Sequence, residues 1–264
     1  MNDPERAPVP AAAVAERAVG GWRVTTVATV GSTNSDLLAA AATGAPERTV
    51  LLAELQTGGR GRLQRSWVSP AGAGLTFSLL VRPTVPVADW GWLPLLTGLA
   101  LGQTLGPDAR LKWPNDLLLG PAGGKVAGIL AQAEAGAVVI GVGLNVSTTA
   151  AELPVPTATS LALQGYRHRD RTALLTGFLT AFAGLFDSWQ AAHGDAEACG
   201  LAAGYRASCA TLGQLVSAQL PGRSVRGQAV GIDPAGRLLL APEDRSDRLA
   251  IAVGDVTHVR PISR

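Results

Sequence analysis

Residues 109–146 read ARLKWPNDLLLGPAGGKVAGILAQAEAGAVVIGVGLNV, and this stretch decides the fold. It consists of short apolar runs that are rich in β-type residues. Only Pro-Asn separates the first two runs, and Pro-Ala-Gly-Gly separates the next pair. Gaps this short favour antiparallel hairpins, because a parallel pair needs a crossover of about a dozen residues or more. The stretch therefore predicts an antiparallel sheet.

Other parts of the chain predict helices and a second, smaller sheet. Residues 93–105 indicate a helix inside the strand-rich region. Residues 171–190 place leucine and phenylalanine at spacings of three and four, which predicts an amphipathic helix whose aromatic stripe packs in the core. Short alternating segments after residue 210 predict a meander of five strands. The expected domains are a loosely ordered lead-in over residues 1–20, a main domain over 21–210 and a small domain over 211–264.

The composition excludes several classes of protein. Of 264 residues, 47% are hydrophobic and 16% are charged, so the chain can bury a core. Its net charge of +2 is too small to mark the whole chain as a binder of DNA or of membrane surfaces. Cys199 and Cys209 belong to no metal-ligand spacing. No secretory signal and no apolar run of ~20 residues is present, so we expect a cytoplasmic protein.

The densest group of chemically active residues follows a predicted strand at residues 49–55. Residues 56–67 read QTGGRGRLQRSW. The glycines let the backbone approach a ligand, while Arg60, Arg62 and Arg65 supply three permanent cations. This combination is suited to phosphate. A flexible basic surface loop or an RNA-binding patch would contain the same residues.

Two motifs with a lysine lie within the stretch 109–146. Residues 112–116 read KWPND, a pattern that also occurs in plain hairpins. Beside an arginine-rich loop, Lys112 and Asp116 would suit a phosphoanhydride and its Mg²⁺. Residues 123–129 read GGKVAGI, which is not a Walker A loop because valine follows the lysine. Without such neighbours, Lys125 would be an exposed lysine at a strand start.

Two further motifs lie at strand ends. Residues 31–34 read GSTN where a strand gives way to a helix, and helix capping accounts for at least one of these side chains. Residues 141–145 read GVGLN, without the third glycine or the βαβ unit of a dinucleotide-binding fingerprint. No Ser-His-Asp or Cys-His arrangement is evident.

Taken in this order, GSTN, the QTGGRGR segment with Trp67, KWPND, GGKVAGI and GVGLN resemble the motifs of the biotin protein ligases. The resemblance runs from about Trp22 through the C-terminal meander. One motif alone would be weak, whereas five in register are specific. The sequence departs from the family pattern at Leu63 and Gln64, where an arginine and a glycine are common.

The resemblance implies an α+β fold. A central mixed or antiparallel sheet flanked by helices, of the class II synthetase-like type, is expected to precede an SH3-like β-barrel. The implied reaction joins biotin and ATP, with Mg²⁺, into biotinyl-5′-AMP, after which a lysine of a biotin carboxyl carrier domain of an acyl-CoA carboxylase displaces AMP. Members that bind DNA carry an N-terminal domain of about sixty residues. The segment before Ser32 is shorter, so a monofunctional ligase that does not bind DNA is expected.

The resemblance also implies roles for individual residues. It makes Lys125, Arg62 and Lys112 the catalytic residues, and Asp116 the candidate magnesium ligand. The expected nucleotide-binding residues are Arg60, Arg62, Arg65, Trp67, Asn115 and Asn145. The expected biotin-binding residues are Ser32, Thr33, Asn34, Gln56, Gly59, Arg60, Gly61, Arg62, Lys125 and Gly128.

Two other functions share parts of this pattern. A lipoate or octanoate ligase of the same superfamily would share the sheet and the lysine product. It is not expected to combine the GRGR and KWPND segments. A non-catalytic module could bind nucleic acid or a partner through residues 60–65, but it would show further basic clusters and stacking aromatics, and the arginines after residue 210 are dispersed.

Overall fold

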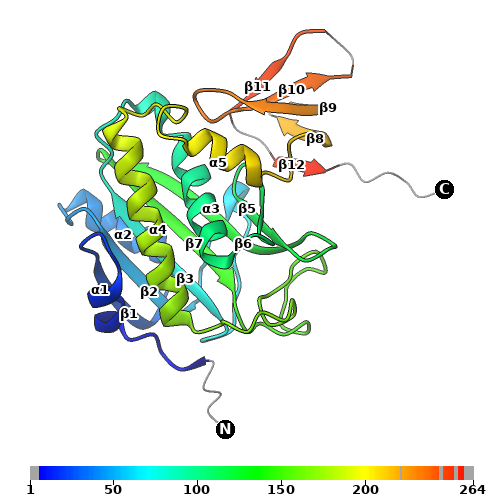
Figure 1. The fold of residues 1–264 in the computed structure, drawn as a ribbon. Coiled ribbons are helices and arrows are strands. Elements are labelled where there is room, and N and C mark those ends of the chain that lie inside the picture. The colour runs from blue at the N-terminus through cyan, green and yellow to red at the C-terminus, as the bar shows by residue number, and fades with distance from the viewer. Residues whose placement is uncertain (1–5, 221, 244–245, 253–254, 259–264) are drawn as a thin grey trace.

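The computed structural model describes residues 6–220, 222–243, 246–252 and 255–258, so residues 1–5 and 259–264 of the expected end segments lie outside the described residues. A seven-stranded sheet runs in the order β1, β2, β3, β7, β6, β5, β4 (Figure 1). Only β1 and β2 pair in parallel, and every other neighbouring pair of this sheet is antiparallel. The strands are β1 (Arg23–Val30), β2 (Thr49–Gln56), β3 (Gly74–Val81), β4 (Arg110–Lys112), β5 (Asp116–Leu119), β6 (Gly124–Glu134) and β7 (Ala137–Asn145).

The hairpins predicted from residues 109–146 are confirmed, since β4, β5, β6 and β7 pair in sequence order. The pattern of β7 shows how one strand serves two faces. Val138, Ile140, Val142 and Leu144 lie in the main hydrophobic core. The alternate positions include Gly141 and Gly143, because successive side chains of a strand point to opposite faces. One face of the sheet is therefore apolar, and the other leaves room for neighbouring side chains.

Helices cover the two faces unequally. α3 (Trp92–Leu105) and α4 (Arg171–Ala191) pack together across the apolar face (Figure 1). α2 (Thr33–Ala42) lies on the opposite face, where Leu37 and Ala41 pack against Leu80 and Val139 in a smaller cluster. α5 (Leu201–Ser208) contacts α3. The part of the second face that α2 leaves uncovered is available for a cavity.

The aromatic stripe of α4 is core, as its spacing predicted. Phe178, Phe182 and Phe186 are buried, and neighbouring rings along the stripe are 5.7 to 5.9 Å apart. Phe178 also meets Phe77 of β3 edge to face at 5.2 Å, which ties the helix to the sheet. Burying each such ring stabilises the fold by about 1.5–3 kcal/mol. Within the described part of the chain, no helix has the length and apolarity required to cross a membrane.

The N-terminal segment is more ordered than its composition predicted. Residues 11–17 form α1 (Ala11–Arg17), and Val9 and Val14 are buried in the main core. The Arg171 guanidinium donates to the Ala7 carbonyl at 2.6 Å and pairs with Glu54 at 2.7 Å. The other Glu54 oxygen accepts the Val9 N–H at 2.8 Å. The expectation of a loosely ordered lead-in is therefore wrong for residues 6–20, because buried polar partners and two valines fix the segment.

The C-terminal strands form a five-stranded antiparallel sheet in the order β11, β10, β9, β8, β12 (Figure 1). Two buried indoles join it to the main sheet. Trp92 donates to the Pro234 carbonyl at 2.7 Å, and Trp113 donates to the Gly236 carbonyl at 3.1 Å. Both contacts satisfy a donor that burial would otherwise leave unpaired. The strands are β8 (Leu215–Leu220), β9 (Arg223–Ile232), β10 (Leu238–Pro242), β11 (Leu249–Ile251) and β12 (Asp255–His258).

Candidate active site

A cavity of about 1260 Å³ lies on the face of the sheet that α2 leaves uncovered. Every predicted site residue except Gly59 lines it. The sequence motifs therefore converge, although more than a hundred residues of chain separate the first from the last. Three parts differ in chemistry: a neutral polar floor, a pair of lysines around one carboxylate, and an arginine-rich loop.

The neutral part, called the floor below, consists of Ser32, Thr33, Asn34 and Gln56. Ser32 caps α2, and its hydroxyl accepts the Ser35 N–H at 3.4 Å. The Gln56 amide oxygen accepts the Thr33 N–H at 2.7 Å and lies 2.9 Å from the Thr33 hydroxyl. These hydrogen bonds connect the N-terminus of α2 to the end of β2 without the help of a ligand. Neutral donors and acceptors of this kind suit an uncharged polar ring.

Sequence reasoning missed two members of the polar network beneath the cavity. Ser78 lies in the middle of β3 and is fully buried, and its hydroxyl donates to the Asn34 amide oxygen at 2.6 Å. Gln132 of β6 accepts the Asn34 amide N–H at 2.9 Å. A single serine within the otherwise apolar run LTFSLLV was the available signal, because a buried hydroxyl needs a partner.

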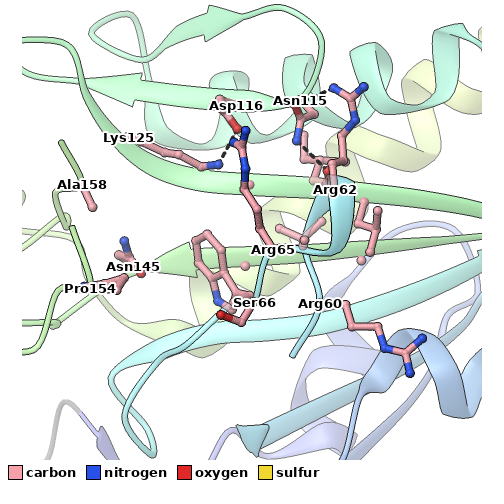
Figure 2. A pocket seen from close by; sticks show the side chains of 18 of the residues that line it. Arg60, Arg62, Arg65, Ser66, Asn115, Asp116, Lys125, Asn145, Pro154 and Ala158 are labelled. Atoms are coloured by element: carbon pink, nitrogen blue, oxygen red, sulfur yellow. Dashed lines mark hydrogen bonds and ion pairs between the residues drawn. The ribbon is translucent and has the colours of Figure 1, made fainter. Parts of the chain in front are cut away.

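The lysines form the charged centre of the cavity. The whole chain contains only two, Lys112 and Lys125, and both approach Asp116. Lys125 Nζ lies 2.6 Å from one carboxylate oxygen (Figure 2). Lys112 Nζ lies 3.7 Å from the other. β4, β5 and β6 deliver these residues through adjacent hairpins. Two cations on one carboxylate leave a net positive charge beside the cavity, which suits an anionic ligand.

The contacts of Asp116 do not fit a bound magnesium ion. Mg²⁺ requires near-octahedral oxygen ligands, usually one or two carboxylates together with substrate phosphates and water. Both oxygens of Asp116 face lysine ammonium groups instead. No cluster of three or more His, Cys, Asp or Glu side chains occurs in the described ranges. The prediction of Asp116 as a magnesium ligand is therefore not supported, and its place is that of a counter-ion to the lysines.

The arginine loop, residues 57–67, forms the third part of the cavity wall. Arg62 donates to the Asn115 amide oxygen at 3.1 Å. Figure 2 shows Arg65 directed toward Asp116 and Lys125, whereas Arg60 points away from them. The loop closes on itself through the Gly61 N–H, which donates to the Arg65 carbonyl at 2.6 Å. In this conformation Arg65 therefore faces Asp116 and Lys125, while Arg62 is held at Asn115.

Leu63 is one of the two residues at which the loop departs from the family pattern. Its φ of +54° lies in the left-handed region, and 60% of the side chain is exposed. A leucine in this conformation costs about 1–2 kcal/mol relative to the right-handed helical region.

Trp67 lies against the sheet through two glycines. A Cβ on Gly143 would be 2.2 Å from the indole, and a Cβ on Gly128 would be 3.2 Å from it. Lys125 Nζ lies 6.0 Å from the centre of the ring. The indole N–H is buried and has no hydrogen-bond partner among the residues described. Side chains at these two positions would displace the indole, so the glycines of GGKVAGI and GVGLN create the seat for Trp67.

The last predicted residues, Asn115 and Asn145, lie on opposite sides of the cavity (Figure 2). The amide groups of both are engaged with backbone: Asn115 donates to the Ile129 carbonyl at 3.0 Å and Asn145 donates to the Thr159 carbonyl at 2.9 Å. The Asn145 contact holds the segment 154–158, which forms part of the wall. Both residues therefore shape the cavity through the backbone that they hold.

The C-terminal sheet also reaches the cavity, which sequence reasoning did not predict. Thr257 and His258 of β12 line it. The His258 ring lies 3.1 Å from the Thr211 hydroxyl. The same hydroxyl accepts the backbone N–H of Trp113 at 3.0 Å. Burial, and the nearby charge of Lys112, hold the pKa of His258 below its ordinary value. The small sheet therefore supports the KWPND turn from behind.

Comparisons with known proteins agree with this architecture. Residues 28–146 match the biotin/lipoate A/B protein ligase family, and residues 211–259 match the biotin protein ligase C-terminal domain. The biotin–[acetyl-CoA-carboxylase] ligase of Mycobacterium tuberculosis is 42% identical over 91% of this chain and 91% of its own length. The ligase of the same name from Paracoccus denitrificans is 34% identical over 79% of this chain and 90% of its own.

A solved structure shows the same fold. The biotin protein ligase of Aquifex aeolicus in complex with biotin and ATP superimposes with a TM-score of 0.72 at 25% identity. The superposition covers 90% of this chain and 99% of that one. The similarity includes both the main sheet and the C-terminal domain, and the two ligases named above match along most of the chain. The chain therefore belongs to the biotin protein ligases.

Proposed function

We propose that this protein activates biotin with ATP and transfers it to a lysine of a biotin carboxyl carrier domain. The observation that supports this most is the change of chemistry along one cavity, from the neutral floor to the two lysines and the arginine loop. Biotin has the same order of groups, with an uncharged ureido ring at one end and a carboxylate at the other. A single ligand orientation then satisfies both ends of the cavity.

The ureido ring would lie on Ser32, Thr33 and Gln56. These side chains are fixed by hydrogen bonds to one another and to α2, so recognition requires little reordering. The apolar part of biotin would lie along residues 59–62 and against Gly128, beside the Trp67 indole and the Lys125 side chain that also approach this glycine. Asn34 would support these side chains from below, and its amide nitrogen donates to the Leu130 carbonyl.

Lys125 would hold the biotin carboxylate beside the α-phosphate of ATP. A carboxylate oxygen attacks the α-phosphorus, the bond to the bridging oxygen breaks, and pyrophosphate leaves. Lys125 Nζ now pairs with Asp116, and the substrate anions would take over that cation. A point charge there reduces the repulsion between the two anions and stabilises the charge that develops at phosphorus. Lys112, Arg62 and Arg65 would hold the pyrophosphate and adenylate.

The adenine would pack on Trp67, whose seat lies next to Asn145 at the far side of the cavity. The buried indole N–H is available to a ligand oxygen there. Magnesium would enter with ATP as part of the substrate, since the residues described offer no ligand set of their own. In the second step the carrier lysine attacks the acyl carbon, AMP leaves, and the amine loses a proton.

We further propose that the main domain ends near residue 210 and that the small domain follows from residue 211. Thr211 lies at this boundary and bonds to both sides of it through Trp113 and His258. The small domain would thus act on the reaction by supporting the KWPND turn.

The test is ATP–pyrophosphate exchange with the purified chain, Mg²⁺ and one acid at a time. We expect exchange with biotin and none with lipoate, octanoate or no acid. Exchange with lipoate or octanoate would assign the protein to the sister activity. Absence of exchange with every acid would contradict the proposal. A purified carrier domain and the same domain with its acceptor lysine changed to arginine then test the second step.

A further inference from the structure

Ser78 is a polar residue where the fold alone calls for an apolar one. It is fully buried in β3, between Leu51 of β2 and Gly141 of β7 in the sheet register. Its hydroxyl lies 2.7 Å from the Thr33 hydroxyl and 2.6 Å from the Asn34 amide oxygen. The side chain therefore touches two residues at the start of α2 and lies beneath the cavity floor.

The neighbouring amide groups can be oriented without ambiguity. The Thr33 backbone N–H lies 2.7 Å from the Gln56 side chain, so the oxygen of Gln56 must face it. The Asn34 side chain lies 3.2 Å from the Leu130 carbonyl, so the nitrogen of Asn34 must face that carbonyl. Consequently both amide oxygens, which cannot donate, point at the hydroxyl pair of Thr33 and Ser78.

This chain of three contacts has one proton too few. The three oxygen–oxygen contacts, Gln56 to Thr33, Thr33 to Ser78 and Ser78 to Asn34, measure 2.9, 2.7 and 2.6 Å. Each needs one proton between its oxygens, and the two hydroxyl groups supply only two. The two shortest contacts are satisfied when Thr33 donates to Ser78 and Ser78 donates to Asn34. The Thr33 hydroxyl oxygen and the Gln56 amide oxygen then lie side by side with no proton between them.

We propose that Ser78 is a positioning residue that makes the floor selective for a ligand that donates an N–H. By drawing the Thr33 proton downward, Ser78 leaves two acceptors facing the cavity, and the ligand supplies the missing proton. This inference rests on the proposed function, in which the donor is one N–H of the biotin ureido ring. Acids whose ring or tail has no N–H, such as lipoate and octanoate, would leave the buried Thr33 hydroxyl oxygen without a donor and the Gln56 oxygen with the Thr33 backbone N–H alone, which is costly.

Gly141 supports the same arrangement. A Cβ at this position would lie 2.1 Å from the Asn34 amide oxygen, so glycine is what allows Asn34 to sit over β7 and accept the Ser78 proton. The direction of the hydrogen bonds is therefore set by β3 and β7 together. Removing the Ser78 hydroxyl would let Thr33 donate to Gln56 and would abolish the acceptor pair.

The experiment compares calorimetric affinities of the wild-type chain and Ser78→Ala for four ligands. These are biotin, desthiobiotin, and the two biotin analogues in which one or the other ureido N–H is replaced by oxygen. In the wild type, one analogue should bind at least about ten-fold more weakly than biotin, while desthiobiotin keeps both N–H groups and serves as the control. In Ser78→Ala, biotin should weaken about ten-fold, and the discrimination against that analogue should fall toward one.

Two further variants separate positioning from general damage. Ser78→Cys has a weak thiol donor in nearly the same volume, so its affinities should lie between those of wild type and Ser78→Ala; it also replaces Ser78→Ala if that variant does not fold. Thr97→Val removes a fully buried hydroxyl inside α3 and should leave all four affinities unchanged. At saturating biotin, the exchange rate of Thr97→Val should stay within about two-fold of wild type, because this hydroxyl bonds to the Leu93 carbonyl within α3 and does not line the cavity.

The outcomes are distinct from those of the proposed function. Absence of biotin binding and exchange in the wild type would overturn the proposed function itself. If the wild type exchanges with biotin but binds both analogues as tightly as biotin, the proposed function stands and only the proposed selectivity for an N–H donor fails. Equal weakening of all four ligands by Ser78→Ala would likewise overturn it, since a purely structural role moves every ligand together.

Discussion

The floor and the arginine loop line the same cavity but are built in opposite ways. Thr33 of the floor and Ser78 beneath it are buried, and hydrogen bonds join them and Gln56 across α2, β2 and β3. The loop is largely exposed, contains three glycines, and places Leu63 in a left-handed conformation. Recognition of a neutral group is thus prepared in advance, whereas the cations sit on a segment with few packing constraints.

The difference follows from the chemistry of each part. Neutral hydrogen bonds discriminate between ligands only when their geometry is fixed and water is excluded, so they belong on strands and helix ends. A triphosphate must enter and pyrophosphate must leave, and a loop that moves serves both events. Lys125 combines the two designs, because a rigid strand holds an ion pair that a substrate can replace. The following variants test this difference between the floor and the arginine loop.

Lys125→Met should have the largest effect. Removing the cation at the reacting anions should lower biotin-dependent ATP–pyrophosphate exchange by about 10²- to 10³-fold. The calorimetric affinity for biotin should change much less, because the floor is untouched. Lys125→Arg is the matched control: it keeps the charge but not the compact ammonium, and should retain intermediate activity. Near-normal exchange in Lys125→Met would show that the lysine is a bystander.

Gly141→Ala tests the floor through its backbone. The new methyl group would collide with the Asn34 amide oxygen at 2.1 Å, and such overpacking costs about 1–3 kcal/mol of the free energy of unfolding. Biotin affinity should fall with it. Gly102→Ala, in α3, meets no atom within 4 Å and should raise stability by up to about 1 kcal/mol. Chemical denaturation of the two variants gives the comparison, and equal stabilities would refute the assigned close contact.

Arg62→Gly tests the loop. Arg62 is anchored on Asn115, so its loss should release free biotinyl-AMP and biotinylate proteins indiscriminately, by about ten-fold over wild type. The only lysines of the chain, Lys112 and Lys125, lie in the cavity, so the readout is mass spectrometry of an added bystander protein. Arg60→Gly removes an arginine that points away from the lysines and should leak less (Figure 2). Modification of the intended carrier alone would contradict this role of Arg62.

A pH titration tests the support given by the C-terminal sheet. The pKa of His258 is lowered in the folded chain, so below its unfolded value of 6.5 the unfolded chain binds more protons. Stability is therefore complete above pH 6.5 and declines as the pH falls toward the folded pKa, because the buried ring must then take up a proton beside Lys112. Unfolding free energies between pH 7.5 and 5.5 should show this slope in the wild type and not in His258→Asn.

The sequence predicts the elements well and their contacts less well. Short turns such as the Pro-Asn of KWPND force hairpins, and the α4 stripe has a clear helical period, so both were predictable from local patterns. The ordered conformation of the segment that leads into α1 was not predictable. Arg171 and Glu54, which are distant in sequence, fix the backbone of Ala7 and Val9. Ser78 and His258 escaped for the same reason. Their roles depend on partners that only the folded chain brings near.

Leu63→Gly should have the smallest effect. It tests directly whether the floor and the arginine loop are independent of each other. Glycine removes a left-handed penalty of about 1–2 kcal/mol, but it adds about 0.5–1 kcal/mol of unfolded-chain entropy. The net gain in unfolding free energy should therefore be about 0.5 kcal/mol, and biotin affinity should not change, since the floor is independent of the loop. Thermal unfolding and calorimetry of this variant measure both quantities. A loss of biotin affinity would mean that the loop helps to build the floor, and the two regions would then be one unit.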